Sequence, residues 1–129
     1  MTITTCTGPM KALEKARLCL DIIQERKAID PVLMEVGRVT SFTDYFLVAS
    51  GASSRQVQAI SQHMARRLRE EGVKPLGIEG EQEGHWVLMD YGDVVIHIFY
   101  QPVREFYDLE GLWTEAPRVR HDEKKNKKT

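Results

Sequence analysis

The residues of this 129-residue chain that could carry out chemistry begin with a turn rich in small residues, Ser50-Gly-Ala-Ser-Ser54. Small residues before a helix can cradle a phosphate. The turn lacks the Gly-Lys-Ser/Thr ending of a nucleotide-binding loop and the Gly-x-Gly-x-x-Gly spacing of a dinucleotide site. A helix cap provided by Ser53 or Ser54 is therefore the favoured interpretation.

Two aspartates, Asp90 and Asp93, bracket the segment Tyr91-Gly92. A nucleotidyltransferase needs two carboxylates that project from adjacent strand positions and hold Mg²⁺ between them. A turn between the two residues gives the wrong spacing for ligands on one face of a strand. We therefore expect no metal, no cofactor and no catalytic residue, and a nucleotidyltransferase-like order of elements would be a likeness of topology alone.

The histidines and cysteines do not form a recognisable site. No two histidines have the close spacing of metal ligands on one helix or strand, although distant residues can meet in space. His97 is expected to be a hydrogen-bonded structural residue, and a triad of Ser53, His97 and Asp90 has no support beyond residue type. Two cysteines are too few for a zinc site or a disulfide framework. The histidines and cysteines are His63, His85, His97, His121, Cys6 and Cys19.

The elements that would position these residues alternate between helix and strand. Apolar residues at helical spacing predict a helix from Lys11 to about Ile29, and a second helix after Ser53 or Ser54 that Gly72 ends. The run 45–50 is apolar on both faces of the pleat, which is typical of a central strand covered on both sides. Further strands are predicted at 32–39, 75–80, 86–91 and 94–100, and a short helix after Pro102.

The pattern predicts the α/β class: a single domain over residues 11–117 with a mixed β-sheet of about five strands flanked by helices. Residues 1–10 are expected to form a flexible N-terminus and residues 118–129 a disordered basic tail, which has one apolar residue in twelve. The apolar runs are far shorter than the ~20 residues of a membrane helix. With no secretory signal at the N-terminus, we expect a cytoplasmic protein.

Charge is distributed unevenly along the chain. Residues 1–69 carry 10 Lys/Arg and 6 Asp/Glu, residues 70–117 carry 2 and 11, and residues 118–129 carry 6 and 2. An acidic central region attracts basic partners and repels phosphate backbones. A solvated acidic face that only aids solubility would give the same pattern, and charge alone does not separate the two.

Three blocks of the sequence resemble the Iojap-type ribosomal silencing factors. Thr43 to Ile60 is similar to the family's central block, Gly80 with Trp86 to Phe99 to its second, and Arg104 to Trp113 to its closing block. The resemblance implies an α/β domain that is not an enzyme and that binds the large ribosomal subunit through ribosomal protein L-fourteen. Occupation of that surface would prevent the small subunit from joining, which represses translation in slow growth or starvation. The resemblance also implies a role in large-subunit assembly.

Large aromatic and acidic residues in the second half of the chain are the expected contact with ribosomal protein. Aromatic side chains supply rigid contact area, and carboxylates supply charge opposite to that of a typical ribosomal protein. Alternation in the strand 86–91 places Trp86, Leu88 and Asp90 on one face, which we expect to meet the partner, and Val87 and Met89 in the core. The predicted contact residues are Glu79, Glu81, Trp86, Leu88, Asp90, Tyr91, Asp93, Tyr107 and Trp113.

Other functions are weaker alternatives. An enzyme of the nucleotidyltransferase or hydrolase type lacks its paired carboxylates. A direct RNA-binding module is favoured by the arginines of residues 54–71 and by the basic tail, which could touch ribosomal RNA, but is opposed by the acidic central region. An exposed apolar patch would also permit a homodimer of the free protein.

Overall fold

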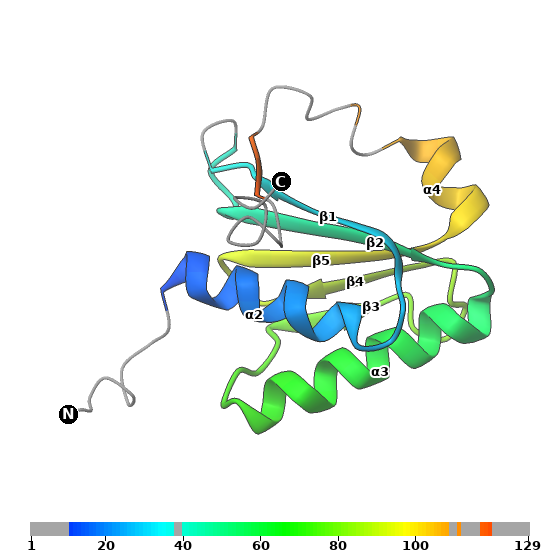
Figure 1. The fold of residues 1–129 in the computed structure, drawn as a ribbon, viewed down its shortest axis with the longest axis horizontal. Helices are drawn as coiled ribbons and strands as arrows, with labels where there is room; N and C mark the ends of the chain where they lie inside the picture. The colour runs from blue at the N-terminus through cyan, green and yellow to red at the C-terminus, as the bar shows by residue number, and fades with distance from the viewer. Residues whose placement is uncertain (1–10, 38–39, 109–110, 112–116, 120–129) are drawn as a thin grey trace, which may run out of the picture.

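The computed structural model describes residues 11–37, 40–108, 111 and 117–119 (Figure 1). In these residues a six-stranded sheet has the strand order β3-β4-β5-β2-β1-β6. β2 and β5 are parallel and the other neighbouring strands are antiparallel, so the sheet is mixed. The elements are α2 (Ala12–Gln24), β1 (Ile29–Glu35), β2 (Tyr45–Gly51), α3 (Ser54–Glu70), β3 (Gly77–Glu79), β4 (Trp86–Asp90), β5 (Val94–Tyr100), α4 (Gln101–Tyr107) and β6 (Arg118–Val119).

The sheet has one face packed on two helices and a second face turned away from them. α2 and α3 lie side by side beneath the first face, whereas α4 packs on β5 and β2 at one end of the molecule (Figure 1). All seven residues of β2 are buried, which confirms the prediction of a central strand covered on both sides. The α/β class is confirmed, with six strands in place of about five.

The main core lies between the first face and the two helices. The apolar stripe of α3 faces the sheet, as its helical spacing predicts, and α2 contributes a second stripe. The strands contribute alternate side chains, because successive residues of a strand point to opposite faces. The principal members from helices and strands are Ala16, Leu20, Ile23, Val57, Ile60, Met64, Leu68, Leu47, Val87, Met89, Ile96 and Ile98.

The ends of α3 confirm the predicted cap and stop. The backbone N–H of Gln56 donates a hydrogen bond of 3.0 Å to Ser53 Oγ, which satisfies a free donor of the first turn. Gly72 follows the last turn with a φ of 82°, a left-handed conformation that favours glycine. The Gly/Ser turn thus starts a helix, and its capping hydroxyl already accepts a hydrogen bond from the backbone of that helix.

The predicted boundary between the first helix and the first strand was wrong. α2 ends at Gln24, because Lys27 adopts a left-handed φ of 58° and redirects the chain. β1 then starts at Ile29, three residues before the predicted strand. Pro31 has no N–H to donate to β2, and the register between β1 and β2 shifts between Ile29 and Val32.

The predicted start of the basic tail also requires correction. Arg118 and Val119 form β6, and pair with Met34 and Leu33 of β1. The backbone of these two residues is therefore held by the sheet. The rest of the predicted tail, residues 120–129, and the predicted flexible N-terminus, residues 1–10, lie outside the described residues.

Candidate partner-binding surface

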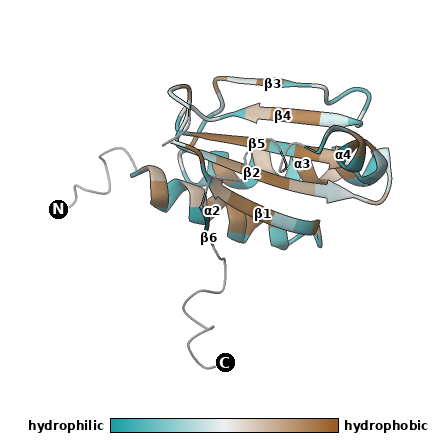
Figure 2. Cartoon of the chain, turned by 90° about the horizontal axis from the view of Figure 1, so that it is seen from above, coloured by the Kyte–Doolittle hydropathy of each residue, from teal (hydrophilic) through white to brown (hydrophobic). Residues whose placement is uncertain are grey.

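The second face of the sheet, opposite α2 and α3, carries a smaller apolar cluster with polar residues beside it (Figure 2). In β4 the alternation is clear: Val87 and Met89 are buried in the main core, while Trp86, Leu88 and Asp90 are half-buried on the second face. The predicted alternation, with Val87 and Met89 in the core, is therefore confirmed, and contact of the other face with a partner stays a prediction. The buried members of the cluster are Met34, Val36, Phe46, Val48 and Phe99, and those packed against it are Val32, Trp86, Val95 and Val103.

Trp86 is held in place by ring contacts and one hydrogen bond. Its ring centroid lies 4.8 Å from that of Phe99 and 5.0 Å from that of Tyr107. The indole Nε1–H donates a 3.1 Å hydrogen bond to Nδ1 of His97. Since a tryptophan indole is a donor only, this bond fixes both the orientation of the indole and the acceptor role of Nδ1. Trp86 is thus a rigid, half-buried aromatic platform.

His97 is a neutral, buried residue of the second face. Burial lowers its pKa from the ordinary value of 6.5 to about 4, because the charged form is poorly solvated there. With Nδ1 accepting from Trp86, the proton of the neutral ring sits on Nε2, which has no hydrogen-bond partner among the residues that the structure describes. The prediction of a hydrogen-bonded structural histidine is confirmed.

The helix α4 extends the aromatic platform towards solvent. Arg104 is buried, and its Nη1 donates to Ser50 Oγ at 2.8 Å and to the carbonyl of Ile29 at 3.1 Å. These bonds tie α4 to the ends of β2 and β1. The outer side chains of the helix, Phe106 and Tyr107, are 81% and 51% exposed, and their ring centroids are 5.2 Å apart. Nothing in the local sequence pattern identified Arg104 as the residue that anchors them.

An acidic loop adjoins the same edge of the sheet. Glu79 of β3 is paired with Leu88 of β4, and directly paired residues of neighbouring strands lie on one face. Glu81 and Glu83 are exposed in the loop that follows. Gln58 of α3 fixes this loop, since its Nε2 donates to the carbonyls of Glu81 at 3.0 Å and Gln82 at 2.8 Å. The carboxylates are therefore presented on an ordered backbone.

The left-handed glycines of this loop allow its close contacts. Gly80 has a φ of 86°, and a Cβ at this position would lie 2.1 Å from the carbonyl oxygen of Trp86. Gly84 has a φ of 71°, with a Cβ position 2.7 Å from the carbonyl oxygen of Ser54. A side chain fits at neither position, so these glycines bring the acidic loop against β4 and α3.

One predicted contact residue, Tyr91, is buried inside the fold, so its predicted role was wrong, and a second, Asp93, is half-buried in an ion pair. Tyr91 is 3% exposed in the main core, where burial raises its pKa to about 12, so its side chain is not accessible to a partner. The carboxylate Oδ1 of Asp93 lies 2.7 Å from Nζ of Lys15 on α2, and this ion pair joins the β4–β5 turn to the helix layer. Strand alternation places Tyr91 with Val87 and Met89, on the face opposite Trp86.

Of the remaining predicted contact residues, Asp90 lies on the second face and Trp113 is not described by the structure. Asp90 is half-buried on the second face, and its Oδ1 accepts the N–H of Gly92, which stabilises the turn. Trp113 lies outside the described residues. The exposed or half-buried residues grouped below as the aromatic–acidic surface are Glu79, Trp86, Leu88, Asp90, Phe106 and Tyr107, together with Glu81 and Glu83 of the loop that follows β3.

The candidate catalytic residues do not form an assembly with one another. Ser53 caps α3, His97 Nδ1 accepts from Trp86, and Asp90 accepts from Gly92. Within the described part of the chain no three His, Cys, Asp or Glu side chains are placed to hold a metal ion, and no helix is long and apolar enough to cross a membrane. Cys19 is buried, which raises its pKa to about 12 and disfavours the reactive thiolate.

The fold and the surface together define a small α/β domain whose exposed aromatic and acidic side chains suit contact with another macromolecule. The family described as ribosomal silencing factor during starvation matches residues 9–129 of the chain. The ribosomal silencing factor of Halalkalibacterium halodurans is 36% identical over 110 residues, which cover 85% of this chain and 94% of that protein.

Two further relatives extend the comparison. A crystal structure of a Chromobacterium violaceum protein superposes with a TM-score of 0.79 at 37% identity, and covers 81% of this chain and 88% of that one. The mouse protein named mitochondrial assembly of ribosomal large subunit protein 1 is 31% identical over 100 residues, 75% of this chain and 44% of that protein. The chain belongs to the family of ribosomal silencing factors.

Proposed function

We propose that this protein binds the large ribosomal subunit through ribosomal protein L-fourteen, with the aromatic–acidic surface as the contact. In the cytoplasm, the bound protein would prevent the small subunit from joining and so repress translation in slow growth or starvation. Membership of the silencing-factor family supports the ribosome as the target. The choice of partner protein rests on the resemblance of the three sequence blocks to the Iojap-type factors.

The observation that carries the proposal is the exposed aromatic pair of α4 beside Trp86. Tyr107 is 51% exposed although its ring centroid lies 5.0 Å from that of Trp86. Rigid, partly buried aromatic residues of this kind dominate binding energies at protein interfaces. The carboxylate of Glu79, which is paired with Leu88, and the exposed carboxylates of Glu81 and Glu83 favour a basic partner.

Occupancy is sufficient for the proposed effect. A standard protein interface buries about 800 Å² on each partner, roughly a tenth of the 7560 Å² surface of this protein. A domain of this size on an intersubunit surface leaves no room for the opposing subunit to approach. No bond has to be made or broken, so the effect should follow binding and disappear with dissociation.

A role in large-subunit assembly is a second candidate function. The mouse relative is named for assembly of the mitochondrial ribosomal large subunit, and the shared region covers 75% of this chain. An assembly factor and a silencing factor could use the same aromatic–acidic surface, since both must dock on the large subunit. The two roles differ in whether the bound subunit is immature or complete.

Co-sedimentation with separated ribosomal subunits tests the proposal. The purified protein is expected to pellet with large subunits and to remain in solution with small subunits. The same large-subunit fractions should form fewer whole ribosomes when small subunits are added. Equal pelleting with both subunits, or binding without any loss of subunit joining, would contradict the silencing mechanism.

A further inference from the structure

Charge in the described residues separates by layer. The helix layer, here residues 11–27 and 54–74, carries ten Lys/Arg and five Asp/Glu. The other described residues carry two Lys/Arg and ten Asp/Glu. Basic side chains are thus in excess on the helix layer. This layer lies on the opposite side of the sheet from the second face (Figure 1). An excess of basic side chains on the helix layer favours an anionic partner there.

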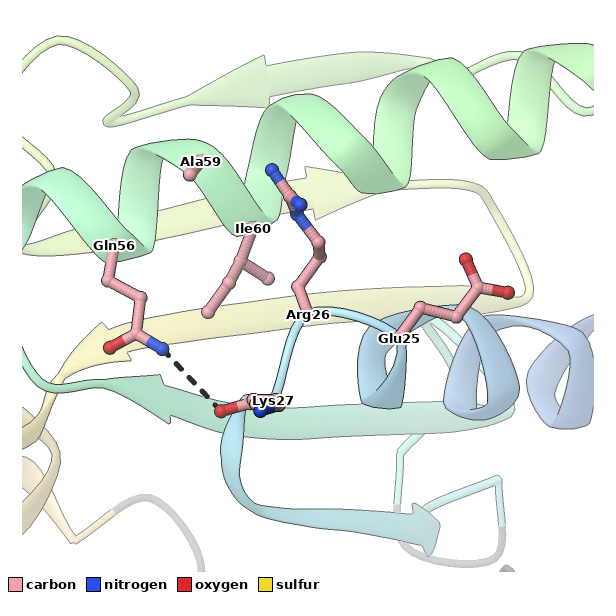
Figure 3. A pocket seen from close by; sticks show the side chains of 6 residues that line it. All are labelled: Glu25, Arg26, Lys27, Gln56, Ala59 and Ile60. Atoms are coloured by element: carbon pink, nitrogen blue, oxygen red, sulfur yellow. Dashed lines mark hydrogen bonds between the residues drawn. The ribbon is translucent and has the colours of Figure 1, made fainter.

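A shallow hollow of about 260 Å³ lies on this basic side, between the end of α2 and the first half of α3. Its floor is Ala59 and Ile60, and its walls are Gln56 and the turn Glu25–Lys27. Figure 3 shows Arg26 extending from the turn towards α3, beside Ile60. The Nε2 of Gln56 donates to the carbonyl of Lys27 at 3.5 Å and joins the two walls. The hollow is therefore framed by tethered elements.

Two cations line the hollow, and two more lie further along α3. Arg26 and Lys27 come from the turn, and Arg55 and Arg66 lie four residues before and seven residues after Ala59, on the same stripe of α3. All four side chains are exposed, and none forms an ion pair with an acidic side chain in the described part of the chain. These four residues are called the basic groove below.

The one acidic side chain at the hollow is already neutralised. Glu25 Oε1 lies 2.7 Å from Nε2 of His63 and 3.3 Å from Nε of Arg67. These hydrogen bonds, that of His63 first, lower the pKa of the Glu25 carboxyl. Arg66 in turn donates from Nη2 to Nδ1 of His63 at 3.0 Å. The acid is thus used to join α2 to α3, and it does not cancel the cations of the groove.

We propose that the basic groove binds the phosphodiester backbone of RNA. The stripe from Arg55 to Arg66 spans eleven residues of helix, or ~16 Å at 1.5 Å per residue. That length exceeds a single phosphate group and suits several consecutive phosphates of one strand. Arginine can bind a phosphate through two parallel hydrogen bonds, and lysine binds it as a compact positive charge. This RNA contact is additional to the proposed protein contact and does not depend on it.

Fluorescence anisotropy of a labelled RNA hairpin, titrated with the full-length protein at several salt concentrations, tests the proposal. The groove variant combines Arg26→Gln with Arg55→Gln. The matched control combines Lys11→Gln with Lys74→Gln, which removes the same charge from the other end of the helix layer (Figure 1). A third variant, Lys124→Gln with Lys125→Gln, removes the same charge from the C-terminal residues. All substituted side chains of the groove and control variants are exposed, and thermal unfolding should show equal stability.

The groove variant is expected to bind the hairpin at least about tenfold more weakly, with the slope of log affinity against log salt smaller by about 2. The control and the C-terminal variants should stay within about threefold of the unsubstituted protein. Equal losses in the groove and control variants, loss confined to the C-terminal variant, or no binding by the unsubstituted protein would overturn the proposal. Binding to vesicles of anionic phospholipid in place of RNA would also overturn it.

Discussion

The two faces of the sheet differ in what covers them. The first face is closed by α2 and α3, and its core residues are apolar and almost wholly inaccessible. The second face contains a smaller cluster, a buried histidine and a tryptophan that is only half-buried. Adjacent residues of β5 illustrate the contrast, because Ile96 belongs to the main core and His97 to the second face.

We infer from this difference that the first face supplies stability, and we propose that the second face supplies recognition. Close packing of apolar side chains against two helices supplies most of the burial that holds the domain together. A half-open face with an anchored indole and exposed aromatic residues offers area that is still available to bury in a complex. Substitutions on the first face should therefore unfold the protein, whereas those on the second should weaken binding first.

The largest expected effect is on stability at the first face. Ile96→Ala leaves a cavity between β5 and the helices, and we expect a loss of about 3 kcal/mol in the free energy of unfolding. Urea unfolding measures this loss. The folded fraction of the variant should still bind large subunits normally. A stability loss below about 1 kcal/mol would show that this face is not the main source of stability.

Replacement of the indole tests the second face. Trp86→Ala should weaken large-subunit binding by about 30-fold or more, since it removes about 2 kcal/mol from a central aromatic contact. Trp86→Phe keeps a ring against Phe99 but removes the donor to His97, so we expect an intermediate loss. Sedimentation binding curves, corrected for the folded fraction, give both values. Unchanged binding by folded Trp86→Ala would exclude Trp86 from the contact.

The buried histidine predicts a pH dependence that belongs to the second face. The pKa of His97 falls from 6.5 in its ordinary state to about 4 in the folded protein. Between these pH values the unfolded chain binds more protons than the folded one, so stability is full above about pH 6.5 and decreases as the pH falls towards 4. This lowering of the pKa corresponds to a loss of roughly 3 kcal/mol at most in the free energy of unfolding at low pH.

Urea unfolding at a series of pH values measures that dependence, and His97→Gln provides the control. The glutamine side chain can still accept from Trp86 but does not titrate. The difference in stability between the unsubstituted protein and the variant should therefore change steadily over this pH range. A difference that is independent of pH would contradict the assignment of His97 as a buried neutral residue.

The acidic loop should have the smallest effect, mainly on the rate of association. Glu81→Gln combined with Glu83→Gln is expected to slow binding to large subunits by about threefold at low salt, and by less as salt screens the charges. Glu70→Gln with Glu71→Gln removes the same charge from the helix side and serves as the control. Stopped-flow or surface-binding kinetics measure both. Equal slowing in the two variants would indicate a general effect of net charge.

Local patterns in the sequence predicted the elements that position the aromatic–acidic surface. The apolar run of β2, the serine cap of α3 and the alternation in β4 depend on neighbours along the chain, and the structure confirms all three. The assignment of Trp86 to one face and Val87 to the other followed from the same alternation.

Features that depend on distant residues were not predicted. The ion pair of Asp93 with Lys15 joins residues 78 positions apart, and the hydrogen bond from Arg104 to Ser50 joins residues 54 apart. The strand β6 exists because Arg118 and Val119 meet the edge of β1. Tyr91 was named as a contact residue for its aromatic ring in an acidic segment, although strand alternation places it on the same face as Val87 and Met89, which the helices cover. Composition does not show which face a helix covers.

Two exposed aromatic residues of the same type allow the most direct test of the contact surface. Phe106 on α4 is 81% exposed and Phe42, between β1 and β2, is 79% exposed. Phe42 lies near the start of β2, whereas α4 packs at the other end of the molecule (Figure 1). Neither substitution to alanine removes a buried side chain, so stability should be little changed.

The decisive measurement is the affinity of Phe106→Ala and Phe42→Ala for isolated large ribosomal subunits, determined by co-sedimentation beside the unsubstituted protein. We expect Phe106→Ala to bind at least about fivefold more weakly and Phe42→Ala to bind as tightly as the unsubstituted protein. Equal affinities for all three proteins, or a loss confined to Phe42→Ala, would contradict the assignment of the aromatic–acidic surface as the contact with the large subunit.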